Sequence, residues 1–383
     1  MREIKNLEQA RAFLQSPDFG PAAYRDIDLR GLSELMEGKD FGTSLFLGCE
    51  LPPPILCQAV NDGAFLIRRI HDFTFPVHRA RLYTPEELFS GLDLSDLSSR
   101  YRTFDHIVFD EYEKAGRDNS ESIRVTLARR LHDHSITEAL STLLVGRKVI
   151  AIMGGHGRER GSEVYQNVAR VSRRLTQEGF FLVSGGGPGA MEATHVGAFF
   201  ATRSEAEMIK AIESMATRPE GALPNREYDD EDWLHRAWLM KTRYPIPEGD
   251  EEACRSIGIP TWAYGHEPPA AFATHIAKYF ANSVREDGLL MIANHGVIFA
   301  PGSAGTIQEI FQDACQNHYF VANGQCSPMI LFGEEYWSKQ KPVWPLLEKL
   351  ARDQMYGEIL SVTDDIDTIL RKMLCYRPDL YRK

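Results

Sequence analysis

Long apolar runs, paired cysteines and an excess of basic residues are all missing from this chain of 383 residues. No stretch reaches the roughly 18 consecutive apolar residues that a membrane-spanning helix needs, so we expect no membrane partner. The six cysteines lie far apart without a Cys-x-x-Cys pair, which argues against a disulfide framework or a zinc site. The charged, amphipathic N-terminus does not have the pattern of a signal peptide. Together these absences predict a reduced, cytoplasmic protein.

The charge balance is acidic, with 43 Lys and Arg against 54 Asp and Glu and a net charge of −11. An acidic surface repels a polyphosphate backbone unless basic residues gather in one patch. The short clusters Arg158 with Arg160, and Arg170 with Arg173 and Arg174, are interpreted as solvated faces of helices or loops. We therefore expect no nucleic-acid partner.

Two blocks divide the chain. Residues 1–140 mix short apolar runs with helix-like spacing, for example over 7–14 and 55–60, and predict a mixed α/β or helical extension; a further helix is expected over 121–145, at its end. The role of this extension stays open between regulation, oligomerisation and sealing of a pocket. In residues 141–383 strands alternate with helices, which predicts an α/β, Rossmann-like, doubly wound parallel sheet.

Apolar strands that end in glycine mark this second block. VIAIMGG begins at Val149, and FFLVSGGG covers 180–187. Between them Ser162 is expected to cap a helix that ends at Glu178, with Gly179 as the stop. Further strands are predicted over 257–264, 295–302 and 328–333, and helices over 269–293 and 306–317. Residues 202–258 are polar and acidic, and predict either a solvated insertion or a lid over a pocket.

Two glycine-rich turns carry the strongest functional signal. Gly185-Gly186-Gly187-Pro188-Gly189 and Pro301-Gly302-Ser303-Ala304-Gly305 each join an apolar strand to a helix. Glycine lets an anion approach the main-chain N–H groups, and the helix N-terminus adds unpaired donors and a partial positive charge. Each turn alone is also explained by a tight strand-to-helix connection. Two in one block, together with Gly154-Gly155 after the first strand, favour a phosphate site.

Other nucleotide sites fit less well. Neither turn carries the lysine of a P-loop, and the first strand lacks a G-x-G-x-x-G turn. Glu309 admits two interpretations. Thr306 and Glu309 have the spacing of a capping box, in which Glu309 bonds back to the Thr306 amide. Alternatively, its carboxylate lies beside the anion site and contacts a ribose or a positively charged sugar.

The motifs GGGPGAM (185–191) and PGSAGTIQE (301–309) resemble those of the LOG family of phosphoribohydrolases, over roughly 148–335. The long N-terminal extension is similar to the longer bacterial members. This resemblance implies an enzyme, an N-glycosidase that hydrolyses nucleoside 5′-monophosphates to free base and ribose 5-phosphate. It also implies a homo-oligomer, and the scheme needs neither a metal nor a cofactor. Ser303 departs from the family pattern, where a second glycine stands.

By position in the motifs, the resemblance assigns catalysis to Glu309 and Arg285. A solvated helix arginine is the alternative for Arg285. The expected phosphate and ribose contacts are Gly154, Gly155, Gly186, Gly187, Gly189, Met191, Glu192, Gly302, Ser303, Ala304, Gly305 and Thr306. His156 and Arg158 either approach the ligand or shape the loop. His132, Asp133 and His134 are expected on a surface helix rather than around a metal.

A second class of function remains open, that of a non-catalytic nucleotide-binding sensor or scaffold. Such a protein keeps both glycine turns and does not need Arg285 or Glu309 for chemistry. An amino-acid decarboxylase, the third class, is disfavoured. Lys210, Lys241 and Lys278 lack the features that support a pyridoxal-phosphate lysine.

Overall fold

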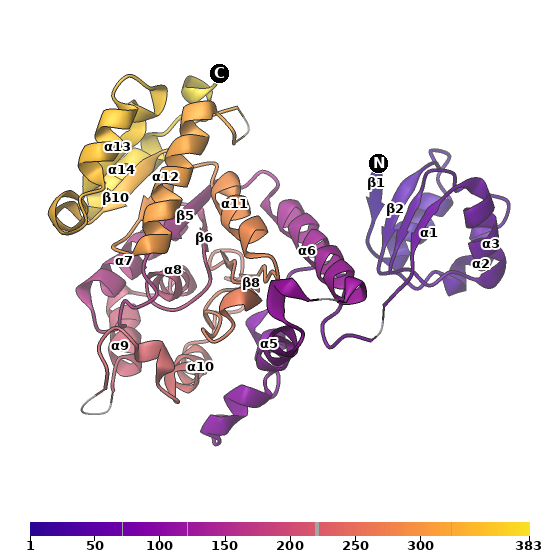
Figure 1. The fold of residues 1–383 in the computed structure, drawn as a ribbon, viewed down its shortest axis with the longest axis horizontal. Helices are drawn as coiled ribbons and strands as arrows, with labels where there is room; N and C mark the ends of the chain where they lie inside the picture. Colours follow the sequence, from indigo (N-terminus) through magenta and orange to yellow (C-terminus); the bar gives the residue numbers. More distant parts are fainter. Residues whose placement is uncertain (71, 121, 219–221, 323) are drawn as a thin grey trace. The chain divides into compact units, whose positions relative to one another are not determined.

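Two parallel β-sheets, one in each of two structural units, form the framework of the protein. The computed structural model describes residues 1–70, 72–120, 122–218, 222–322 and 324–383. The first unit consists of residues 1–82 and 114–143, and the second of residues 83–113 and 144–383 (Figure 1). Within the described residues, no helix has both the length and the apolar character needed to cross a membrane.

The N-terminal unit contains a four-stranded parallel sheet in which the strands lie in chain order. The strands are β1 (Arg2–Ile4), β2 (Ala22–Arg25), β3 (Leu45–Leu47) and β4 (Phe65–Ile67). The helices are α1 (Leu7–Leu14), α2 (Ser33–Met36), α3 (Pro53–Asp62) and α6 (Ile123–Leu144). A core of residues such as Ile4, Tyr24 and Phe46 lies between this sheet and its helices.

Local sequence signals explain the helices of this unit. Asn6 caps α1 by accepting a hydrogen bond from the Gln9 amide at 2.9 Å, and Pro53 occupies the first position of α3. The helix predicted over 121–145 is confirmed as α6, although Glu121 lies outside the described residues. Its placement on the surface was wrong, because His132 and Asp133 are buried. The spacing of apolar residues in this helix did not show which of its faces is buried against the rest of the unit.

The second unit contains a seven-stranded sheet whose strands are all parallel. Its strands are β5 (Val149–Met153), β6 (Phe181–Ser184), β7 (Ser256–Gly258), β8 (His275–Ile276), β9 (Val297–Phe299), β10 (Met329–Phe332) and β11 (Leu360–Thr363). Their order is β11-β10-β9-β5-β6-β7-β8. The chain winds from β5 in one direction and from β9 in the other, which confirms the predicted Rossmann-like, doubly wound fold.

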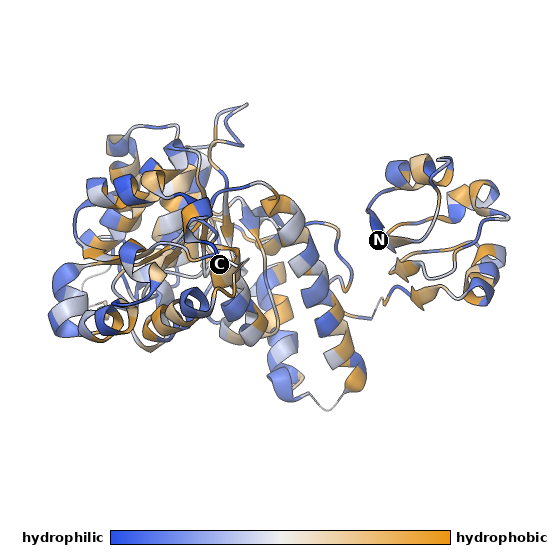
Figure 2. Cartoon of the chain, turned by 90° about the horizontal axis from the view of Figure 1, so that it is seen from above, coloured by the Kyte–Doolittle hydropathy of each residue, from blue (hydrophilic) through white to orange (hydrophobic). Residues whose placement is uncertain are grey.

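Helices lie on both faces of this sheet. The helices of this unit are α4 (Pro85–Leu88), α5 (Phe104–Lys114), α7 (Glu163–Gln177), α8 (Ala190–Phe199), α9 (Glu205–Met215), α10 (Trp233–Arg243), α11 (Asn282–Ile292), α12 (Ala304–Tyr319), α13 (Trp344–Ala351) and α14 (Ile366–Cys375). Right-handed crossovers place α7 and α8 on one face, and α11 and α12 on the other. In Figure 2 the helices carry both hydrophilic and hydrophobic residues, as expected for elements with one buried side.

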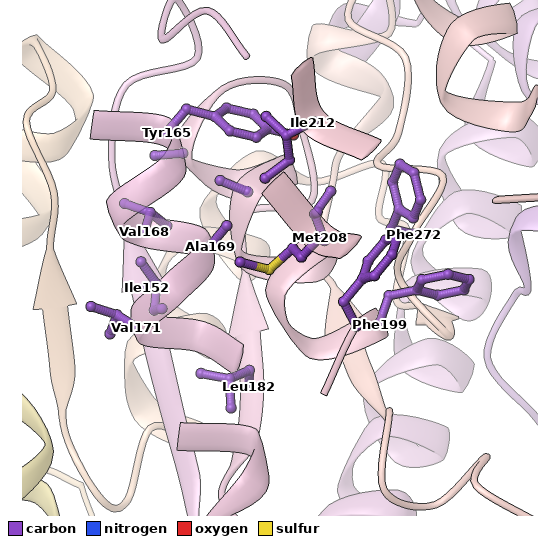
Figure 3. Close-up of a cluster of buried hydrophobic side chains, with 14 of the residues drawn as sticks. Ile152, Tyr165, Val168, Ala169, Val171, Leu182, Phe199, Met208, Ile212 and Phe272 are labelled. Carbon is purple, nitrogen blue, oxygen red and sulfur yellow. The ribbon is translucent and has the colours of Figure 1, made fainter. Parts of the chain in front are cut away.

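The core of this unit lies around α7. Tyr165, Val168 and Ala169 of this helix pack near Ile152 of β5 and Leu182 of β6 (Figure 3). The helix begins after Ser162, whose hydroxyl accepts from the Tyr165 amide at 3.3 Å. It ends before Gly179, which has a φ of +82°. The predicted cap and stop of this helix are both confirmed.

The segment 202–258 differs from the predicted solvated insertion. Met208 and Ile212 of α9 and Trp233 of α10 belong to the core. The acidic run is also partly paired, since Asp230 bonds to Arg218 at 2.8 Å. Residues 219–221 of this segment lie outside the described residues. Amphipathic helices, rather than a free loop, therefore account for its polar composition.

Two predicted elements are shorter than expected. The strand predicted over 257–264 is limited to β7, and residues 262–264 form a 3₁₀ turn. The helix predicted over 269–293 begins only at Asn282, because 275–276 join the sheet as β8. Sheet pairing overrides the weak helical spacing in this region.

A buried ion pair links the two chain segments of the second unit, 83–113 and 144–383. Asp105 of α5 accepts hydrogen bonds from Lys278 and, at 3.0 Å, from the indole of Trp262. All three side chains are buried. Lys278 thus has a buried partner 173 residues earlier in the chain.

Candidate functional site

The switch point of the sheet lies between β5 and β9, where the winding direction reverses. Ligands of open α/β sheets bind at the carboxyl ends of strands at such a point. The turns that follow these two strands are 154–158 and 301–306, two of the three glycine-rich turns predicted to bind phosphate. Topology therefore places them next to each other, and their contacts agree.

Main chain packs on main chain between these two turns. The Gly155 amide donates to the Pro301 carbonyl at 3.2 Å, and Arg158 Nε donates to the same oxygen at 3.0 Å. A Cβ on Gly155 would come within 3.3 Å of the Gly302 Cα. Gly154 is equally enclosed, by the methyl groups of Ala190 and Ala300. Small residues are needed here for the turns to meet.

The third glycine turn, 185–189, supports this arrangement from the side of β6. Gly189 has a φ of +68°, and a Cβ there would overlap the carbonyl oxygens of Gly155 and His156. The Ala190 amide donates to the Gly155 carbonyl at 3.2 Å. The first donor of α8 is therefore occupied by protein, and Gly189 serves the packing of the two turns. Gly186, with a φ of +71°, packs similarly against Ile259 and Pro260.

The N-terminus of α12 is the open part of the site. The first intrahelical hydrogen bond runs from Ile307 to the Ser303 carbonyl at 3.0 Å, so the amides of residues 304–306 precede the helical ladder. Ser303, Ala304 and Gly305 are exposed, whereas Thr306 is buried with its side chain over Gly302. These amides and the helix dipole favour an anion from solvent.

The capping-box interpretation of Glu309 is wrong. Helix α12 starts at Ala304, two residues before Thr306, so Thr306 is its third residue and not its cap. Glu309 lies one turn further along the helix. Because the helix begins at Ala304 and not at Thr306, the Glu309 carboxylate is too far along the helix to cap its first amides.

Two cations flank the open turn. Lys341 Nζ bonds to the Ser303 hydroxyl at 2.7 Å, and the Arg158 guanidinium lies 5.3 Å from the ring centre of Tyr336. The Tyr336 hydroxyl in turn donates to the Gly302 carbonyl. Lys341 was not predicted, because it follows a π-helical turn well beyond the glycine motif. Both charges add to the positive potential at the start of α12.

Arg285 is a buried residue of the site and not a solvated helix arginine. It is 8% exposed, and its Nε donates to the Ile259 carbonyl at 2.8 Å. One of its amino groups donates to the Gly185 carbonyl at 3.3 Å. These bonds tie α11 to the turns after β6 and β7. The guanidinium also acts on two carboxyl groups, those of Glu267 and Glu309.

Glu309 is a partly buried acid with an unusual pKa. Its pKa is raised to about 7, mainly by loss of solvent, which Arg285 opposes and Glu286 reinforces. Within the described part of the chain, no hydrogen-bond or ion-pair partner holds its carboxylate. A carboxyl group that titrates near neutral pH can donate or accept a proton there.

Glu267 is a second acid near the turns, and was not among the predicted site residues. Burial raises its pKa, which the charges of His156, His266 and Arg285 lower. His156 Nδ1 lies 3.7 Å from its Oε1. Its Oε2 would be 3.2 Å from a Cβ on Gly187. Only its neighbours in space, His156, Gly187 and Arg285, indicate a role for this residue.

Met191 and Glu192 lie beneath the turns. The Met191 sulfur packs against Gly185, and its methyl group packs against Gly187. Glu192 is fully buried, and its carboxylate accepts from Arg160 at 2.7 and 2.9 Å and from Tyr165 at 2.7 Å. This ion pair also shows that Arg160 was wrongly assigned to a solvated cluster, since it is 1% exposed.

A metal centre has no support in the ranges that the structure describes. No group of three or more His, Cys, Asp or Glu side chains there is arranged to hold an ion. The polar groups of the site are main-chain amides, cations and two carboxyl groups that Arg285 links.

Comparison with known proteins gives a limited result. No family model and no curated protein matches the chain. Among solved structures, it is similar to the molybdenum cofactor binding protein of Rippkaea orientalis, with 14% identity and a TM-score of 0.35 over 59% of this chain and 94% of that one. It is also similar to the molybdenum cofactor carrier protein of Chlamydomonas reinhardtii, with 14% identity and a TM-score of 0.34 over 60% and 99%.

These findings correct the resemblance drawn from the glycine motifs. The predicted membership in the LOG family is wrong, because the matching structures are molybdenum cofactor proteins and no family model or curated protein supports it. The predicted hydrolysis of nucleoside 5′-monophosphates, and the terms hydrolase and glycosidase, fall with it. At such low identity and TM-score, the ligand of these proteins does not transfer to this chain.

Proposed function

We propose that the second unit binds a phosphate-bearing small molecule at the switch point between β5 and β9. The observation that carries this proposal is the contact between the turns 154–158 and 301–306 at the open N-terminus of α12. Free main-chain amides and a helix dipole are suited to a phosphate. Arg158 and Lys341 supply positive charge on either side.

Binding has more support here than any particular reaction. Main-chain donors and lysine or arginine recognise a phosphate regardless of the group to which it is attached. More specifically, we propose a nucleoside monophosphate as the ligand. A non-catalytic sensor is the alternative, and it requires only that this ligand binds. Catalysis, a homo-oligomeric state and a cytoplasmic location stay predictions. Glu309 and Arg285 are the groups through which catalysis would act.

Gly305 offers a selective test. It is exposed, and a Cβ at this position meets no other atom within 4 Å. Gly305→Asp therefore places a negative charge at the anion site without a clash, and an acidic residue in the first turn favours the helix. Gly305→Ala is the matched control, because it adds the Cβ without the charge.

The experiment titrates wild type and both variants with phosphate, ribose 5-phosphate, the four common nucleoside monophosphates and the molybdenum cofactor, using isothermal titration calorimetry. We expect at least one phosphate compound to bind. Gly305→Asp should weaken that binding by tenfold or more, because its carboxylate repels the phosphate. Gly305→Ala should weaken it by less than about threefold. A tenfold change corresponds to about 1.4 kcal/mol of binding free energy. Binding by none of these compounds, or equal binding by Gly305→Asp, would refute the proposal.

A further inference from the structure

The N-terminal unit has cavities at the carboxyl edge of its own parallel sheet, separate from the glycine turns. Strands β2, β3 and β4 are neighbours, so the turns that follow them lie side by side. Two cavities of about 340 and 350 Å³ open at this edge, and Arg69 lines both. Carboxyl edges of parallel sheets are common ligand sites.

Arg69 is held in a fixed position between the two cavities. Its guanidinium pairs with Asp26 at 2.5 Å, and its Nε donates to the Gly48 carbonyl at 3.2 Å. Asp26 has a φ of +51°, in the left-handed region that residues other than glycine rarely adopt. Such strain persists only where the surroundings enforce it, and it clusters at ligand sites.

His78 supplies an independent indication of a ligand. Its ring is 7% exposed and packs against Gly48, where a Cβ would come 2.6 Å from its Cδ2. Its Nε2 is buried and has no hydrogen-bond partner among the described residues, and the residue lines the cavity of about 350 Å³. Buried polar nitrogens nearly always have a hydrogen-bond partner. A bound ligand would supply the partner that His78 Nε2 lacks.

The same cavity is lined by two stacked aromatic rings. Phe73 and Phe75 both line it, with ring centres 5.2 Å apart and an angle of 29° between the planes. Aromatic faces of this kind favour contact with another planar ring. The lining of the cavity thus combines two aromatic rings with the polar groups of Asp26, Arg69 and His78.

Charge decides which planar ligand fits. Asp26 and Arg69 already neutralise each other, and burial lowers the pKa of His78 to about 4, so its ring is neutral at pH 7. Two other cations act on these groups: Arg25 pairs with Glu3 and Glu138, and Arg79 donates to the main-chain carbonyls of Arg81 and Leu82. A ligand with a net charge would find no counter-charge among Asp26, Arg69 and His78, which is costly in a partly buried setting. An uncharged ligand needs only a donor and an acceptor on its edge.

We propose that this cavity binds an uncharged planar heterocycle of nucleobase size through Asp26, Arg69 and His78. The carboxylate accepts from ring N–H or amino groups, the guanidinium donates to ring carbonyls or nitrogens, and the His78 Nε2 completes the edge. This site is independent of the phosphate site, and neither proposal requires the other.

The test uses the full chain and three probes, adenine, uracil and the planar anion benzoate, in isothermal titration calorimetry. His78→Phe keeps the ring against Gly48 and removes the nitrogen, and Asp26→Asn keeps a residue that tolerates the left-handed region. Arg30→Gln is the matched control, because Arg30 is exposed in the same unit and pairs with Asp28. Gly305→Asp reports on the other site.

We expect adenine or uracil to bind and benzoate to bind at least tenfold more weakly. Both His78→Phe and Asp26→Asn should lower the affinity for the base tenfold or more, while Arg30→Gln and Gly305→Asp stay within about twofold of wild type. Circular dichroism checks that each variant folds, and Asp26→Asn decides alone if His78→Phe does not. Absence of binding by both bases, unchanged affinity in Asp26→Asn, or equal binding of benzoate overturns the proposal.

Discussion

Neutralising Glu192 should destabilise the second unit by about 3 kcal/mol. Glu192→Gln keeps the size of the side chain and leaves the Arg160 guanidinium buried without its bidentate partner. Breaking one half of a buried ion pair costs about 3–5 kcal/mol. Glu227 remains near Arg160 and accepts from its amide at 2.7 Å, which favours the lower end of this range. The loss is a large fraction of the roughly 5–15 kcal/mol that stabilise a typical domain.

Tryptophan fluorescence during urea unfolding measures this loss. All five tryptophans, at 233, 238, 262, 337 and 344, belong to the second unit, so the signal reports on that unit alone. Trp233 is also a local probe, with its ring centre 4.3 Å from the Arg160 guanidinium. Arg160→Met combined with Glu192→Met serves as the control, and should recover most of the stability because no charge is left unpaired. A loss below about 1 kcal/mol for Glu192→Gln, or a double variant no better than the single one, would refute the reasoning.

Three further outcomes are expected. Gly302→Val should abolish phosphate binding and lower the melting temperature, since a Cβ there overlaps the Thr306 side chain; an unchanged melting temperature would contradict the close packing. The pKa of Glu309, raised to about 7 in the folded protein, disfavours its charged form, so its contribution to stability is present below about pH 4.5 and is lost as the pH rises through 7. Unfolding at pH 5.5 and 8.5 should therefore show that Glu309→Gln gains stability over wild type mainly at pH 8.5. Burial lowers the pKa of His195 to about 3, so its stabilising effect is present above pH 6.5 and is lost as the pH falls. His195→Phe should weaken this acid sensitivity but lose the bonds to Ser184 at 2.8 Å and Ser256 at 2.9 Å, which urea titrations at pH 4.5 and 7.5 would separate.

The sequence was most informative where strands and turns are local. Strands β5 and β6 are continuous apolar runs that end in glycine, and the cap at Ser162 follows a simple rule of helix starts. The alternation of strands and helices predicted a parallel sheet, but it does not give the strand order, which places the turn 154–158 rather than 185–189 beside 301–306. Arg285 bonds to the Gly185 carbonyl, while its role in a reaction stays a prediction.

Residues brought in from distant parts of the chain could not be predicted. Lys341 reaches Ser303 across 38 positions, and Asp105 reaches Lys278 across 173. No local period encodes such contacts, because they depend on how helices pack. Motif likeness failed for a different reason. Glycine turns at helix starts recur wherever a backbone approaches an anion, so they indicate a kind of ligand and not a family.

The interleaving of the two units bears on how the protein is made. Residues 83–113 leave the ribosome early, yet the lysine that neutralises Asp105 is synthesised 173 residues later. At about 5–20 residues per second, this delay amounts to roughly 9–35 s. During that time the Asp105 carboxylate of α5 has no lysine with which to pair. The second unit therefore cannot complete its folding until the segment around β8 has been synthesised. The first unit, whose last segment ends at residue 143, can finish folding well before then.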